Sequence, residues 1–133
     1  LPLPDLHPAA LECAQAVLCA GDQGKYWEMG SDVLKNPKKV APTDLSGYAK
    51  GLGLDTATFD KCLSSGKYEE RVKAEQAVGL GLGLSGTPSF VVGLTDPSDP
   101  SKLNATSVIR GAQPYAQFKQ TIDELLAKQK KGG

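Results

Sequence analysis

The chain has 133 residues, of which 40% are hydrophobic and 23% are charged, and this is the size and composition of one ordinary globular domain. No run approaches the roughly 18 apolar residues that a membrane-spanning helix needs, so the sequence predicts no membrane span. Fifteen Lys plus Arg residues balance fifteen Asp plus Glu residues, and this neutral balance argues against nucleic acid as a partner.

The amino-terminal end does not begin with Met. Residues 1–5 (Leu-Pro-Leu-Pro-Asp) lack the basic start and the apolar core of a signal peptide. We expect that a segment upstream of Leu1 has been removed, either a leader or a stretch of the domain itself.

Five helices are predicted in the first 82 residues from apolar spacing and from Pro and Gly punctuation. A residue that can cap a helix stands before two of them, Thr43 and Asp55. Around the second cap, Leu54 and Phe59 have the spacing of a hydrophobic staple. The predicted ranges are 8–20, 25–34, 43–52, 55–65 and 67–82.

The sequence pattern changes after residue 84. Short β-branched and aromatic runs at 89–92 and 107–109 are bounded by Gly93 and Gly111, which is typical of strands. The connection between them is rich in Asp, Ser and Pro, so we expect an exposed loop. A last helix is predicted from Pro114 onward, with one apolar stripe formed by Tyr115, Phe118, Ile122, Leu125 and Leu126.

Two strands are too few for a stable sheet, because an isolated two-stranded ribbon is marginal in water. We expect that another copy of the chain or an upstream segment supplies the missing strands, or that the hairpin lies flat on the helices. The pattern as a whole predicts an α+β fold that is mostly helical.

Residues 85–93 (Ser-Gly-Thr-Pro-Ser-Phe-Val-Val-Gly) are the most informative stretch. Together with residues 108–115 and the helix that follows, they resemble the carboxyl-terminal half of DsbA-like thiol-disulfide oxidoreductases of the thioredoxin superfamily. In that family Gly-Thr-Pro carries the cis-proline loop. The resemblance implies a partial thioredoxin-like fold.

The resemblance extends toward the amino terminus. Residues 3–8, 19–29 and 59–68 are similar to parts of the helical insertion of the same family, so nearly the whole chain is covered. This implies a helical insertion domain at 1–84 and the carboxyl-terminal part of a thioredoxin-like domain at 85–133.

The resemblance implies a role in forming or exchanging disulfides in exported proteins, in the periplasm or another extracytoplasmic space. It implies Thr87 and Pro88 as substrate-binding residues, because a cis bond before proline turns the preceding amide and carbonyl outward. The implied partners are extended cysteine-containing polypeptides and a redox partner protein, with no cofactor. An ordinary turn proline before an edge strand is the alternative interpretation.

The chain departs from the family at the reaction centre. Dithiol exchange needs a nucleophilic Cys with a second Cys close by, usually as Cys-X-X-Cys, whereas the three cysteines here are Cys13, Cys19 and Cys62. The family carries its Cys-X-X-Cys on a segment that would precede Leu1. No catalytic residue is therefore assigned, the chain is expected to be inactive alone, and its status as an enzyme stays open.

Cys19 and Cys62 fall where many members of the family carry a second cysteine pair, which implies a structural disulfide between them. Two buried free thiols are the alternative. Cys13 is interpreted as a small core residue, because no basic neighbour in sequence would lower its pKa. His7, the single histidine, is interpreted as a turn residue, and no metal site is predicted.

A cluster of apolar residues in the second predicted helix, Tyr26, Trp27 and Met29, resembles a family signature on the helical cap. The chemistry of these side chains alone indicates a buried helix face.

The alternative function is a non-catalytic peptide-binding or chaperone-like module that has lost the dithiol and forms a homodimer through its unpaired strands.

Overall fold

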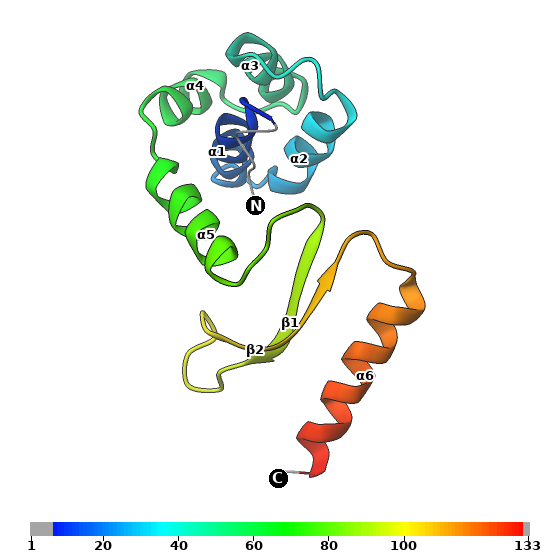
Figure 1. The fold of residues 1–133 in the computed structure, drawn as a ribbon. Coiled ribbons are helices and arrows are strands. Elements are labelled where there is room, and N and C mark those ends of the chain that lie inside the picture. The colour runs from blue at the N-terminus through cyan, green and yellow to red at the C-terminus, as the bar shows by residue number, and fades with distance from the viewer. Residues whose placement is uncertain (1–6, 132–133) are drawn as a thin grey trace. The chain divides into compact units, whose positions relative to one another are not determined.

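A computed structural model describes residues 7–131 of the chain. Helices dominate the described residues, and a single strand pair follows the fifth helix (Figure 1). The elements are α1 (Ala10–Gly21), α2 (Tyr26–Lys35), α3 (Pro42–Gly51), α4 (Thr56–Ser64), α5 (Glu69–Gly81), β1 (Ser89–Thr95), β2 (Leu103–Arg110) and α6 (Tyr115–Lys131). The predicted α+β, mostly helical class is confirmed.

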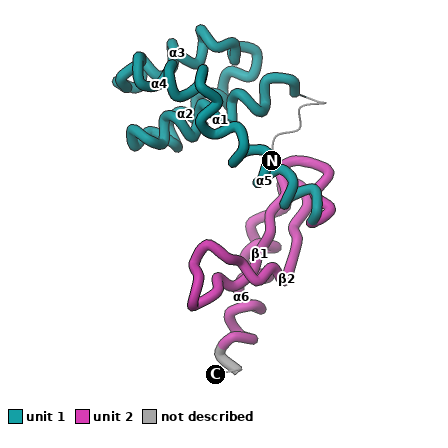
Figure 2. The backbone as a smooth tube through the Cα atoms, turned by 90° about the vertical axis from the view of Figure 1, so that its left-hand side faces the viewer, with its two compact units in different colours: residues 1–81 teal, residues 82–133 magenta. Residues whose placement is uncertain are grey.

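The chain divides into two compact units, Leu1–Gly81 and Leu82–Gly133 (Figure 2). Unit 1 contains the first five helices, and unit 2 contains the strand pair and α6. Of the stretch 3–8 that resembles the family, only the last two residues lie within the described residues. No described helix combines the length and the apolar character that crossing a bilayer requires.

Unit 1 is built around α1, which packs against α2, α3, α4 and α5. Small side chains on α1 let the neighbouring helices approach closely, and larger side chains from those helices fill the space between them. The buried core consists of Ala16, Cys19, Ala20, Met29, Leu45, Ala49 and Phe59.

The start of α4 follows the sequence prediction. The Asp55 carboxylate accepts a hydrogen bond from the backbone N–H of Thr58 at 2.7 Å, which caps the helix. Phe59 is fully buried and Leu54 packs against the same core. Both the predicted cap and the predicted staple pair are therefore found at this helix.

The start of α3 differs from the prediction. The helix begins at Pro42, and the backbone N–H of Ala41 donates a hydrogen bond to the Asp44 carboxylate at 3.1 Å. Thr43 lies inside the first turn, so the cap predicted at Thr43 is wrong. The reason is that proline suits the first helical position, where a backbone N–H has no partner within the helix.

In unit 2, β1 and β2 pair antiparallel from Ser89 opposite Arg110 to Thr95 opposite Leu103, with an irregularity between Val92 and Gly93. Both strands extend beyond the predicted runs 89–92 and 107–109, and the loop is correspondingly shorter. Residues 103–107 are exposed, so their pairing depends on the backbone and leaves no apolar pattern in the sequence.

The apolar contacts within unit 2 are few. Leu84 and Ile109 are buried, and the Phe90 ring of β1 meets the Phe118 ring of α6 edge to face, with centroids 4.9 Å apart. Neither strand pairs with any further strand in the described part of the chain. The predicted stripe on α6 is only partly covered, since it leaves exposed Tyr115, Ile122 and Leu126.

Candidate functional site

The loop before β1 holds the residues that the family resemblance implies for substrate binding. The peptide bond between Thr87 and Pro88 is cis, and both side chains are exposed. The Ser89 hydroxyl donates to the Gly86 carbonyl at 2.6 Å, and the Gly111 N–H donates to the Pro88 carbonyl at 2.8 Å. Both flanks of Thr87 are thus hydrogen-bonded within unit 2, while its side chain faces solvent.

The strand that follows this loop has a free edge. Within the described residues β1 pairs with β2 alone, and Phe90 at the start of the strand is exposed although its ring contacts Phe118. An open strand edge can accept an extended peptide through main-chain hydrogen bonds, with side-chain pockets adding specificity. The loop and this edge strand, residues 85–95, contain no cysteine.

Two of the three cysteines are bonded to each other. Cys19 and Cys62 form a disulfide with an S–S distance of 2.00 Å and a Cα–Cα distance of 5.9 Å. Cys19 is buried in the core of unit 1, whereas Cys62 is partly exposed. The bond therefore ties the buried face of α1 to α4.

A polar cluster lies next to the exposed end of this disulfide. One carboxylate oxygen of Asp22 is 3.9 Å from the Cys62 sulfur, a contact and not a hydrogen bond, because a disulfide sulfur carries no proton. The same carboxylate accepts hydrogen bonds from Lys67 Nζ at 2.7 Å and from the Tyr68 hydroxyl at 2.5 Å. The hydrogen bond from Lys67, followed by that from Tyr68, lowers the pKa of Asp22.

Cys13 is the free cysteine on α1, and it is half-buried. The interpretation of Cys13 as a core residue is wrong, because the side chain lies outside the buried cluster. Burial, and secondarily the charge of Glu12, raises the pKa of the Cys13 thiol. A raised pKa leaves little thiolate at neutral pH, so Cys13 is a poor nucleophile.

No group of three His, Cys, Asp or Glu side chains among the described residues is placed to hold a metal ion. His7 is exposed, and its carbonyl accepts a hydrogen bond from the backbone N–H of Ala10 at 2.9 Å in the turn that leads into α1.

One protein family matches most of the chain. The DSBA-like thioredoxin domain family matches residues 3–123. The chain belongs to this family. The DsbA-like resemblance and the partial thioredoxin-like fold predicted from the sequence are therefore confirmed.

Curated relatives of this DsbA-like chain carry another name. A Na(+)/H(+) antiporter NhaA 1 of Salinispora arenicola is 43% identical over 93 residues, which are 69% of this chain and 14% of the relative. A Na(+)/H(+) antiporter NhaA 3 of Salinispora tropica is 34% identical over 107 residues, or 80% of this chain and 16% of the relative.

A third relative, a Na(+)/H(+) antiporter NhaA 1 of Mycobacterium sp. (strain KMS), is 30% identical over 114 residues, or 84% of this chain and 18% of the relative. The chain thus spans less than a fifth of the length of these curated relatives. No solved structure is significantly similar to it.

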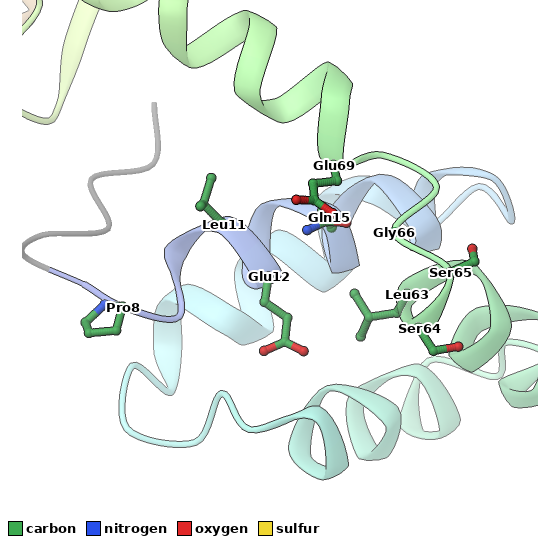
Figure 3. Close-up of a pocket in the computed structure, with 9 residues that line it drawn as sticks. All are labelled: Pro8, Leu11, Glu12, Gln15, Leu63, Ser64, Ser65, Gly66 and Glu69. Atoms are coloured by element: carbon green, nitrogen blue, oxygen red, sulfur yellow. The ribbon is translucent and has the colours of Figure 1, made fainter.

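Sequence reasoning missed a pocket in unit 1 of the DsbA-like chain. It has a volume of about 390 Å³ and is lined by residues of α1, of α4 and of the turn into α5 (Figure 3). Glu12, Gln15 and Glu69 are among its polar residues, and Glu69 is paired with Lys73 at 2.5 Å. No cysteine, histidine, lysine or arginine lines it, so the Ser64 and Ser65 hydroxyls have no histidine or lysine beside them in the pocket that could act as a base.

The helical signature at the start of α2 also differs from its interpretation. Met29 is fully buried as expected, but Tyr26 is exposed and Trp27 is 82% exposed. The interpretation of this motif as a buried helix face is therefore wrong for the two aromatic residues. The seven-residue spacing puts Trp27 and Leu34 on one face of α2, and at 3.6 residues per turn this face lies opposite Met29. The sequence signal is therefore that the two faces cannot both turn toward the same core.

Proposed function

We propose that this chain supplies the peptide-binding part of a DsbA-like thiol-disulfide oxidoreductase that forms or exchanges disulfides in exported proteins. Its substrates are extended cysteine-containing polypeptides, and a redox partner protein resets the dithiol. The single observation that carries the proposal is membership of the DSBA-like family combined with an exposed Thr87–Pro88 loop beside the free edge of β1.

In this proposal the substrate lies over the loop and pairs with backbone groups at Thr87. Pro88 has no N–H, so it places no competing donor beside the reacting sulfur. The nucleophilic thiolate comes from a Cys-X-X-Cys outside these 133 residues, because the three cysteines within them have no such spacing. The chain alone is then inactive.

We assign residues 1–84 to the helical insertion domain and residues 85–133 to the carboxyl-terminal part of the thioredoxin-like domain. The division of the chain into compact units at Gly81 and Leu82 supports this assignment. An extracytoplasmic location, such as the periplasm, is supported by the Cys19–Cys62 disulfide, because disulfides persist in oxidising compartments.

The names of the curated relatives indicate which kind of protein contains a domain similar to this chain. Ion antiport is the named activity of those much longer proteins, and this chain matches only a domain-sized part of them. We propose that the shared part is the DsbA-like module itself, so that in those relatives it accompanies the antiporter. The activity proposed for this chain remains disulfide exchange.

A non-catalytic peptide-binding or chaperone-like module is the second candidate. The observation that favours it is the unpaired outer edge of both strands in the described residues, which a second copy could cover across a two-fold axis. Sedimentation distinguishes the two candidates, because this one requires a dimer.

The peptide-binding step can be tested by titrating the full chain with a fluorescent extended peptide that contains one cysteine. A Thr87→Arg variant places a bulky charge at the proposed contact, and we expect binding to weaken about tenfold or more. Thr95→Arg is the matched control, because Thr95 is also an exposed threonine of unit 2 but lies at the other end of β1. Equal effects of the two variants, or no binding by the unaltered chain, would contradict the proposal.

A further inference from the structure

Two apolar side chains project from α2 into solvent. Trp27 and Leu34 are each 82% exposed, more than any other large hydrophobic side chain in the described residues. They are seven residues apart, nearly two helical turns, so they lie on one face of the helix. The positions between them on this face are Gly30 and Ser31, which are small.

The opposite face of α2 already has its partners. Met29 is fully buried, and Val33 packs against the same core cluster. The Tyr26 ring meets the Trp27 ring edge to face, with centroids 5.0 Å apart. Trp27 and Leu34 form a strip, called the α2 strip below, that takes no part in the hydrophobic core of unit 1.

Positive charge gathers at the end of this strip. Lys35 ends α2, and Lys38 and Lys39 follow; all three are exposed. None of the three forms an ion pair with another described side chain. Residues 25–39 contain four lysines against two acidic residues, although the whole chain has a net charge of +0.

The acidic residues of this segment offset the charge only in part. Glu28 is paired with Lys25 at 2.9 Å, and Asp32 is the other carboxylate on α2. An exposed tryptophan, an exposed leucine and an excess of lysines form a combination typical of surfaces that rest on anionic bilayers.

We propose that the α2 strip docks on the surface of an anionic lipid bilayer. Trp27 and Leu34 enter the boundary between headgroups and acyl chains, and Lys35, Lys38 and Lys39 face the lipid phosphates. Charge complementarity and the interfacial preference of tryptophan favour a bilayer over an acidic protein, which would have to offer a matching pocket for both apolar side chains. The inference is independent of the proposed disulfide chemistry.

Trp27 makes the proposal directly testable, because it is the only tryptophan of the chain. Its fluorescence is recorded for the full chain with vesicles of phosphatidylcholine alone and of phosphatidylcholine mixed with phosphatidylglycerol. We expect a shift to shorter wavelength and protection from acrylamide only with the anionic vesicles. Added salt should weaken the response, since it screens charges beyond about 10 Å at 0.1 M.

Variants separate the two parts of the surface. A Lys38→Ala/Lys39→Ala double variant should bind the anionic vesicles roughly thirty-fold more weakly, and Leu34→Ala about tenfold more weakly. Lys50→Ala/Lys61→Ala is the matched control, because it removes the same charge from exposed positions on α3 and α4. We expect this control to retain most of the binding.

Four results would overturn the proposal. The first is no spectral change with anionic vesicles, and the second is an equal response to neutral ones. The third is an equal loss in the Lys50/Lys61 control, which would indicate attraction by charge without a site. The fourth is a Trp27 that is already shielded from acrylamide before vesicles are added, because the strip would then be covered by protein. None of these measurements involves Thr87 or thiol chemistry, so failure here leaves the proposed function standing.

Discussion

The sulfur of Cys62 on α4 is bonded to the sulfur of Cys19 on α1, and only the Cys62 end of this disulfide reaches the surface of unit 1. Cys19 is buried in the hydrophobic core of unit 1, so the bond belongs to the packing of the helices and not to a reactive cleft. An incoming thiolate that attacks Cys62 would have to leave a thiolate on Cys19 in an apolar setting, which disfavours exchange.

Removal of this disulfide should destabilise unit 1. The bond closes a loop of 43 positions, and on the chain-entropy account such a loop contributes about 4 kcal/mol to the free energy of unfolding. We expect the Cys19→Ala/Cys62→Ala variant to unfold at a much lower urea concentration than the parent chain. Cys13→Ala is the control and should unfold close to the parent, and a double variant as stable as this control would count against the account.

Gly93 should tolerate no side chain. A Cβ atom there would lie 2.2 Å from the carbonyl oxygen of Asn104, a backbone atom of the paired strand. We expect Gly93→Ala to destabilise the strand pair by about 1–3 kcal/mol, seen as faster hydrogen exchange of the amides in β1 and β2. Gly47→Ala, where a Cβ meets nothing within 4 Å inside α3, should instead stabilise by about 0.5–1 kcal/mol. Equal effects would show that Gly93 is not closely packed.

The cluster around Asp22 should make stability depend on pH. The hydrogen bond from Lys67, and then that from Tyr68, lowers the pKa of Asp22 in the folded chain. The Asp22 carboxylate therefore adds to the free energy of unfolding when the pH is above its unfolded pKa of about 3.9. This contribution is lost as the pH falls through the lower folded value. Asp22→Asn should therefore melt below the parent chain at neutral pH, and the difference should close in acid.

Lys67 makes the stability of the same cluster depend on pH in the alkaline range as well. The hydrogen bond to Asp22 raises the pKa of Lys67. The contribution of the Lys67 ammonium to the free energy of unfolding is therefore present below its unfolded pKa of about 10.4, and it is lost as the pH rises through the raised value. Asp32→Asn is the control, because Asp32 forms no ion pair with a described side chain. A melting difference for Asp22→Asn that is constant with pH would exclude a charge effect.

Cys13 should be slow to alkylate. Burial and the charge of Glu12 raise the pKa of its thiol, so its reaction with iodoacetamide at pH 8 should be slower than that of free cysteine and should still accelerate above pH 9. Mass spectrometry should find one label on the native chain and three after reduction and denaturation. Rapid labelling at neutral pH, or more than one label without a reductant, would contradict this description.

Local signals in the sequence predicted the helices well, because caps and staples act within a few residues. Asp55 and Phe59 occupy the cap and staple positions that their spacing predicts. Thr43 does not cap α3, because the helix already begins at Pro42 and Ala41 holds the cap position. The outer parts of the strands were missed because residues such as Asn104 pair only through the backbone.

Features that depend on how helices pack could not be predicted. Trp27 is apolar and helical, so the default expectation is burial, yet Met29 and Val33 already fill the inner face of α2. The pocket beside Gln15 requires α1, α4 and the turn into α5 to be placed in space. By contrast, the loop at Thr87 and Pro88 was found from the family resemblance, since an isolated Gly-Thr-Pro would indicate only a turn.

The first experiment is to measure the intact mass of the protein from its natural source, after alkylation with and without reduction, because this mass shows whether a redox dithiol accompanies the loop at Thr87 and Pro88. We expect a mass well above the 13.9 kDa of these 133 residues, with two further cysteines, spaced as Cys-X-X-Cys, in the additional segment. A natural mass of 13.9 kDa would rule out the proposed disulfide exchange, because the protein would then have no Cys-X-X-Cys.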